Sequence, residues 1–204
     1  MDVQMTPVQT QEGDYKLGLW IRDDTQGIGT MTYVCANGAF GALGHGISDG
    51  DTGLLVQTSG GELYDTEILG VEKGSFGKPG VMSGVIYYGN QSRLGSRVKN
   101  PAIPIGYRQD VKKGRACIRS SVSGELKDYE IEIQKIDHSS NRHNKDMVIR
   151  VTDPELLSLT GGIVQGMSGS PIIQNGKLIG AVTHVFIQDS TRGYGILVEN
   201  MLGH

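Results

Sequence analysis

The stretch that decides the fold class is Lys127-Asp-Tyr-Glu-Ile-Glu-Ile-Gln-Lys-Ile136, in which apolar and polar residues alternate. Tyr129, Ile131 and Ile133 fall on one face of an extended chain, and acidic and amide side chains fall on the other. A period of two is typical of a β-strand that buries one face and leaves the other in water.

Short strand candidates of the same kind recur along the chain, separated by turn residues every 8–12 positions. They cover residues 16–21, 27–34, 40–43, 54–57, 66–72, 81–88, 93–99, 114–119, 147–151, 170–173 and 177–185. Gly89-Asn90 and Asn175-Gly176 predict hairpin turns. Helical signals are few: Asp153-Pro154 predicts a helix start with Asp153 as N-cap, and 198–202 predicts one or two helical turns. This pattern favours an all-β barrel or sandwich.

Composition agrees with a β-rich globular protein. Glycine accounts for 31 of 204 residues, while apolar residues still make up 37%. The net charge of −3 gives no basic surface for nucleic acid. No apolar stretch approaches the roughly 18 residues of a membrane span, and no signal peptide is visible, so we expect a cytoplasmic protein or a domain of a longer one. Cys35 and Cys117 are compatible with one disulfide or with two free thiols.

The strongest chemical motif is Gly166-Met167-Ser168-Gly169-Ser170-Pro171, followed by an apolar strand. Acyl transfer needs an exposed hydroxyl beside backbone N–H groups that hold an oxyanion. The two glycines permit a sharp turn that exposes Ser168 and directs the N–H groups of Gly166 and Ser168 into one small space. The motif therefore indicates a nucleophilic serine, against the simpler interpretation of an ordinary Gly/Ser turn.

His45 is the candidate general base. It ends a strand candidate and lies 123 residues before Ser168. In this sequence the candidate histidine comes before the candidate serine, whereas in α/β-hydrolases the serine comes before the histidine. His138 and His143 lie in a polar loop, and no cysteine cluster accompanies them to indicate zinc.

These two motifs resemble those of chymotrypsin-like serine peptidases. The resemblance implies a double β-barrel with few short helical turns: a polar tail over residues 1–14 and a peptidase domain over 15–204, with lobes of about 15–100 and 101–204. It also implies that Thr183 and His184 lie on the strand that contacts substrate, although an ordinary strand histidine is an equal alternative for His184. The chemistry needs no metal or organic cofactor.

A narrower resemblance, to the SpoIVB peptidases of sporulating bacteria, is carried by five stretches spread between Lys16 and Leu202. They are Gly-Leu-Trp-Ile-Arg-Asp (18–23), Gly-Ile-Gly-Thr-Met (27–31), Ala-Leu-Gly-His-Gly-Ile-Ser-Asp-Gly-Asp-Thr-Gly (42–53), Val-Thr-Asp-Pro (151–154) and the long run from Thr160 to Phe186.

This resemblance implies a signalling peptidase that is secreted from the forespore into the space between the two membranes of the developing spore. Its partner there would be a membrane-embedded regulator of an intramembrane protease, and cleavage would lead to activation of a late sigma factor. Self-cleavage is also implied. The family carries an N-terminal membrane segment and a PDZ domain that are not recognisable in this sequence, so we expect a peptidase domain alone.

The third catalytic residue stays open at the level of sequence. The family resemblance points to Asp153, fifteen residues before Ser168, which would fix the tautomer of His45. That role competes with the helix N-cap. The general chymotrypsin-like order favours Asp65 or Asp110 instead, and a Ser-His dyad is a further alternative. A β-barrel that binds peptides without cleaving them is the alternative from another functional class.

Overall fold

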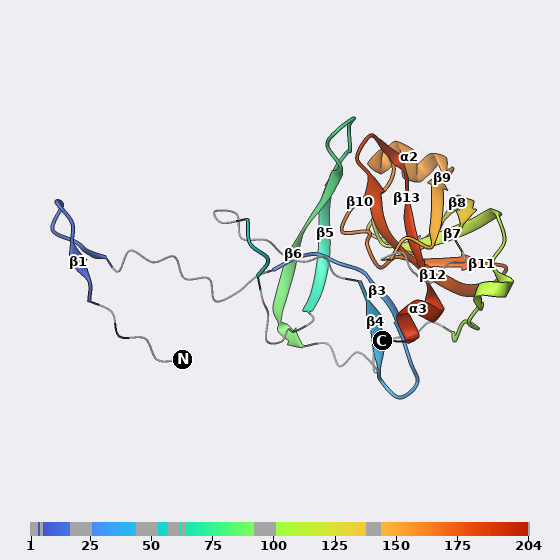
Figure 1. Ribbon diagram of the computed structural model, residues 1–204, viewed down its shortest axis with the longest axis horizontal. Helices are drawn as coiled ribbons and strands as arrows, with labels where there is room; N and C mark the ends of the chain where they lie inside the picture. The colour runs from blue at the N-terminus through green and yellow to red at the C-terminus, as the bar shows by residue number, and fades with distance from the viewer. Residues whose placement is uncertain are drawn as a thin grey trace.

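In the computed structural model the protein is built almost entirely of β-strands, which confirms the all-β prediction (Figure 1). The structure describes residues 4, 6–16, 26–43, 53–56, 62, 64–91, 101–137 and 144–203. Within them the elements are β1 (Val8–Gln9), β2 (Tyr15–Lys16), β3 (Met31–Val34), β4 (Phe40–Ala42), β5 (Tyr64–Glu72), β6 (Gly80–Gln91), η1 (Arg108–Asp110), β7 (Gly114–Ser120), β8 (Lys127–Ile136), β9 (Met147–Val151), α2 (Pro154–Thr160), β10 (Val164–Gln165), β11 (Pro171–Gln174), β12 (Lys177–Phe186), β13 (Asp189–Leu197) and α3 (Val198–Leu202).

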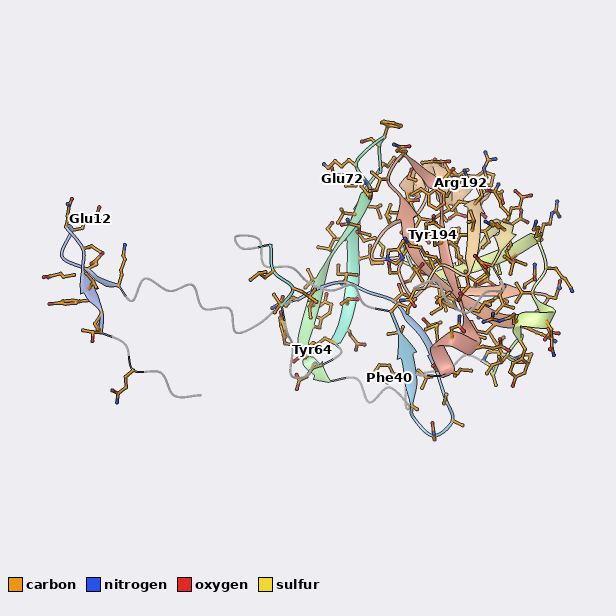
Figure 2. The ribbon with its side chains drawn as sticks, in the orientation of Figure 1. Glu12, Phe40, Tyr64, Glu72, Arg192 and Tyr194 are labelled. Carbon is orange, nitrogen blue, oxygen red and sulfur yellow. The ribbon has the colours of Figure 1, made fainter. Side chains whose placement is uncertain are left out.

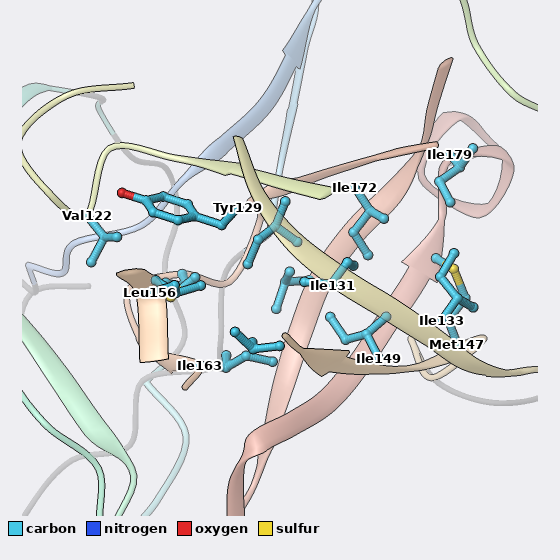
Figure 3. Packing of buried hydrophobic residues seen from close by; sticks show 14 of the residues in the cluster. Val122, Tyr129, Ile131, Ile133, Met147, Ile149, Leu156, Ile163, Ile172 and Ile179 are labelled. Carbon is cyan, nitrogen blue, oxygen red and sulfur yellow. The ribbon is translucent and has the colours of Figure 1, made fainter. Parts of the chain in front are cut away.

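The second half of the chain forms a closed barrel in the order β11-β12-β13-β9-β8-β7. Antiparallel pairing of β11 with β7 closes it, with Ile172 opposite Ile118. The barrel supplies most of the hydrophobic core, and Figure 3 shows its side chains meeting in the interior. Tyr129, Ile131 and Ile133 are each 1% exposed, so the alternation of β8 predicts its buried face correctly.

Two barrel glycines are required by close approach between strands. A Cβ on Gly180 would collide with the carbonyl oxygen of Ile196, and one on Gly193 would collide with that of His184. Because β12 and β13 pair along this line, a side chain at either position would push the two strands apart. Part of the high glycine content therefore serves barrel closure rather than turns.

Besides the β1–β2 hairpin, the first half of the chain contributes two smaller sheets within the described residues. The long β5–β6 hairpin is joined by β10 in a three-stranded sheet, and β3 pairs with β4. The pairing of β10 with β6 is parallel, with Val164 opposite Gly80. Since β10 immediately precedes the Gly166–Ser170 segment, this pairing ties that segment to the first half.

Several local predictions are confirmed, and one is wrong. The helix over residues 154–160 begins at the Asp153 cap as predicted, and α3 covers 198–202. Gly89-Asn90 is not a hairpin turn, because β6 continues to Gln91. The register shifts there, from Asp65 opposite Tyr87 to Tyr64 opposite Gln91, so an irregularity within the strand accommodates the extra residues.

Other features were absent from the sequence-based prediction. Strand β13 was not predicted at all, and residues predicted as a polar tail contain β1, which pairs with β2 in an exposed hairpin. The strand candidate at 93–99 lies outside the described residues.

The two cysteines do not form a disulfide: both Cys35 and Cys117 are free thiols. Burial is the main cause that raises the pKa of the Cys117 thiol.

We predict that Ile131→Ala destabilises the protein by about 2–5 kcal/mol, because it leaves a cavity at the centre of the barrel. Leu126→Ala is the matched control, since Leu126 is 55% exposed, and we expect it to change stability by less than about 0.5 kcal/mol. Urea unfolding followed by circular dichroism measures both. Equal losses for the two variants would contradict the assignment of the core.

Candidate active site

The turn that carries Ser168 connects β10 to β11 and has two residues in left-handed conformations. Gly166 has φ of 103° and Gly169 has φ of 90°. A Cβ on Gly169 would also collide with the carbonyl oxygen of Thr30, and one on Gly166 would collide with Met82. Both glycines are therefore favoured by their backbone conformation, and Gly169 is also needed for space because its neighbour is a backbone atom.

Strand β12 fixes the position of the turn in the barrel. The Gly169 N–H donates to the Val182 carbonyl at 2.8 Å, and the Val182 N–H donates to the Ser170 carbonyl at 2.9 Å. The hydroxyl of Ser168 donates to the carbonyl oxygen of Thr183 at 2.8 Å. The serine side chain is thus held against the strand that the sequence predicts to contact substrate.

A segment from the first half of the chain holds the same turn from the other side. Thr30 donates twice, from its N–H to the Ser168 carbonyl at 3.2 Å and from its hydroxyl to the Gly166 carbonyl at 2.9 Å. The buried hydroxyl of Thr32 donates to the Gly169 carbonyl at 2.7 Å. We call Thr30 and Thr32 the threonine clasp. It fixes three peptide planes of the turn.

The orientation of the Ser168 N–H follows from a further bond within the turn. The Met167 carbonyl accepts from the Ser170 N–H at 2.9 Å. Every described peptide bond is trans, so the Ser168 N–H points away from that carbonyl. Met167 itself is completely buried, which anchors the centre of the turn in the core.

Thr183 and His184 lie near the end of β12. The Thr183 side chain is 3% exposed, and its hydroxyl donates to the carbonyl of Asn144 at 2.8 Å. Its backbone carbonyl, rather than its side chain, faces Ser168. His184 is half-buried. The predicted contact of these two residues with substrate stays a prediction.

Asp153 occupies the helix-cap position that competes with its predicted catalytic role. One carboxylate oxygen accepts from the Leu156 N–H at 3.0 Å, and the other accepts from the Glu130 N–H at 3.2 Å. A carboxylate has about four lone-pair positions, so these two bonds leave it capacity for another donor. Its role as the orienting acid therefore also stays a prediction.

The other candidate acids lie elsewhere. Asp65 is on β5, opposite Tyr87 of β6. Asp110 ends η1, where it pairs with Lys177 at 3.1 Å and accepts from the Tyr107 N–H. The hydrogen bond from Lys177 is the main cause that lowers the pKa of Asp110. This pairing gives Asp110 a structural contact, and its role as the orienting acid stays an untested alternative.

The predicted base, His45, lies outside the described residues, as do His138, His143 and His204. Among the residues that the structure does describe, no group of three or more histidine, cysteine or acidic side chains is placed to hold a metal ion. In the same part of the chain, no helix is long and apolar enough to cross a membrane.

Sequence reasoning missed the threonine clasp. Thr30 was noted only as part of a glycine-containing strand, and Thr32 was not singled out. The available signal was the alternation of two hydroxyl residues, Thr30 and Thr32, which places both on one face of an extended segment. That alternation alone does not indicate which segment, more than a hundred residues later, accepts the hydrogen bonds.

The protein combines an antiparallel barrel with a serine held in a turn of two left-handed glycines, and it is a member of a serine peptidase family. It belongs to the SpoIVB peptidase S55 family, whose model matches residues 13–102 and 87–202. Comparison with curated proteins gives no match.

Solved structures similar to this chain include the Rv3671c protease from M. tuberculosis. Its active form matches with a TM-score of 0.38 and 16% identity, over 69% of this chain and 58% of that one. Its inactive form matches with a TM-score of 0.38 and 15% identity, over 69% of this chain and 65% of that one. The chain therefore spans less than two thirds of the length of either.

We predict that Thr30→Val slows the reaction of Ser168 with a fluorophosphonate probe by about 10-fold, because the half-buried Gly166 carbonyl loses its donor and the turn loosens. The exposed Thr66 on β5 provides the matched control, Thr66→Val. Labelling rates are compared at a temperature where circular dichroism shows both variants folded. Unchanged labelling of Thr30→Val would show that the clasp does not position the nucleophile.

Proposed function

We propose that Ser168 is the nucleophile of this peptidase and that His45 is its general base. His45 takes the hydroxyl proton as the Ser168 oxygen attacks the peptide carbonyl carbon. It then gives that proton to the leaving amine as the C–N bond breaks, and water hydrolyses the acyl-enzyme by the same route. The observation that carries the proposal is the Ser168 turn itself, which the clasp and β12 hold from two sides.

The oxyanion is held, in this proposal, by the N–H groups of Gly166 and Ser168. Support comes from the fixed peptide planes of the turn, because a preorganised donor costs little reorganisation when charge develops. The Ser170 N–H restrains the Met167 carbonyl, which shares a peptide plane with the Ser168 N–H. The Thr30 hydroxyl restrains the preceding plane, which contains the Gly166 carbonyl and the Met167 N–H.

The Ser168 hydroxyl must leave the Thr183 carbonyl before its proton can pass to a base. A single neutral hydrogen bond contributes about 1 kcal/mol net, so exchanging it for one to an imidazole is a small step. Rotation about the side-chain torsion of Ser168 is sufficient. The vacated Thr183 carbonyl can then accept a hydrogen bond from substrate backbone.

For the biological role, we propose cleavage of a membrane-embedded regulator of an intramembrane protease, in the space between the forespore and mother-cell membranes. This cleavage signals activation of a late sporulation sigma factor, and the enzyme also cleaves itself. Membership of the SpoIVB peptidase S55 family over most of the chain supports the assignment. Thr183 and His184 are the proposed substrate-contacting residues.

The proposed nucleophile and base are tested with purified wild-type protein, Ser168→Ala and His45→Ala. We expect wild type alone to react with a fluorophosphonate probe and to cleave casein or a regulator-derived peptide. The folded state of each variant is checked by circular dichroism. Labelling of Ser168→Ala at the wild-type rate would contradict the assignment of the nucleophile.

The pH dependence of labelling gives a second test of the base. Only neutral imidazole accepts the proton, so the rate should fall as pH drops through the pKa of His45, about 6.5 for an unperturbed histidine. A rate that stays constant between about pH 5 and 8 would count against a histidine base.

The two roles of Asp153 are separated by Asp153→Asn, because asparagine also caps helices well. If Asp153 orients His45, kcat falls by on the order of 10⁴-fold while the protein stays folded. If Asp153 serves only as the cap, kcat stays within a few-fold of wild type. Asp153→Ala should in either case lose about 1 kcal/mol of stability, measured by urea unfolding.

A further inference from the structure

Two packed aromatic rings on β12 and β13 lie between two cationic side chains and form a stack with them. The Arg192 guanidinium lies 5.1 Å from the centre of the Phe186 ring. Phe186 packs on Tyr194 with ring centres 4.7 Å apart, and the Lys145 ammonium lies 5.0 Å from the centre of the Tyr194 ring. Figure 2 labels Arg192 and Tyr194 along β13. Arg150 of β9 is directly opposite Arg192 in the ladder.

This surface concentrates positive charge in a protein whose net charge is −3. None of the ion pairs within the described part of the chain includes Lys145, Arg150 or Arg192. Glu132 is opposite Arg150 in the ladder on the β8 side and offsets part of this charge, although Gln134 also donates a hydrogen bond to its carboxylate. Two like charges directly opposite on neighbouring strands are unfavourable, so the Arg150–Arg192 pair favours binding of an anionic group.

Two members of the stack, Phe186 and Lys145, are close in sequence to residues that contact the candidate nucleophile or its partner. On β12, Phe186 follows three residues after Thr183, whose carbonyl accepts the Ser168 hydroxyl. On the other side, Lys145 follows Asn144, whose carbonyl accepts the Thr183 hydroxyl. At about 3.3 Å per residue, Phe186 lies roughly 10 Å along the strand from Thr183.

We propose that Lys145, Arg150 and Arg192, with Phe186 and Tyr194 between them, form a specificity subsite for an acidic side chain of the substrate. This inference rests on the proposed function. An extended peptide that binds beside β12 places its third residue from the scissile bond about 10 Å from the nucleophile. The cations attract the carboxylate of that residue, and the aromatic rings pack against its aliphatic part.

The test uses Ser168→Ala, so that peptide binding is measured without cleavage. The peptides are identical except for Glu or Gln at the third residue on either side of the scissile bond. We expect the Glu peptide to bind about 5- to 30-fold more tightly at one of these positions, with a difference that shrinks as salt increases. Equal affinities of the Glu and Gln peptides at both positions would overturn the subsite.

Further substitutions, each made in the Ser168→Ala protein, test whether the preference for the Glu peptide comes from this surface. Arg192→Gln should remove most of the preference for Glu, and Arg192→Glu should reverse it toward a Lys peptide, a gain that misfolding cannot produce. Lys113→Gln is the matched control, because it removes one exposed positive charge just before β7. If the Arg192→Glu protein still prefers the Glu peptide as strongly as before, the inference is wrong.

Failure of the subsite and failure of the proposed function give different results. Wild-type protein that neither reacts with the fluorophosphonate probe nor cleaves any peptide would overturn the peptidase proposal for Ser168. Cleavage with normal labelling, but with equal kcat/KM for the Glu and Gln peptides, would overturn the subsite alone. A preference expressed in KM, with kcat unchanged, is the result expected of a binding subsite.

Discussion

The geometry of the site depends on the hydrogen bonds between the threonine clasp and the Ser168 turn. Thr30 and Thr32 donate to the carbonyls of Gly166, Ser168 and Gly169. Each bond contributes only about 1 kcal/mol net. Their importance is geometric, because they bring a segment of the first half of the chain against a turn of the second half. Gly169 permits this approach, because a Cβ at that position would collide with the carbonyl oxygen of Thr30.

The barrel was the most predictable part of the structure. Its strands alternate strongly, and β8 and β9 begin and end where the pattern predicts. Strand β13 was missed because Asp189–Leu197 contains two glycines and several polar residues. Its buried positions include Gly193 and Gly195, where close packing excludes a side chain. A strand that buries glycine gives no hydrophobic periodicity, so its sequence does not identify it.

The candidate site was predictable only in part. The Ser168 motif is local, because a few adjacent residues determine both the turn and the exposed hydroxyl. The clasp and the Asn144–Thr183 contact join residues that are between 39 and 138 positions apart in sequence and share no pattern. For Asp153 the sequence correctly indicated a cap. It could not determine whether the same carboxylate also serves the base, because capping leaves some of its lone pairs available.

Thr183 links the proposed chemistry to the proposed specificity. Its carbonyl accepts the nucleophile, and its hydroxyl fixes the backbone of Asn144, next to Lys145. Asn144 itself has φ of 56°, an uncommon conformation that the Thr183 bond helps to hold. Thr183 therefore contacts the candidate nucleophile through its backbone carbonyl and the backbone beside Lys145 through its side chain. One residue of β12 thus joins the position of Ser168 to the position of the proposed subsite.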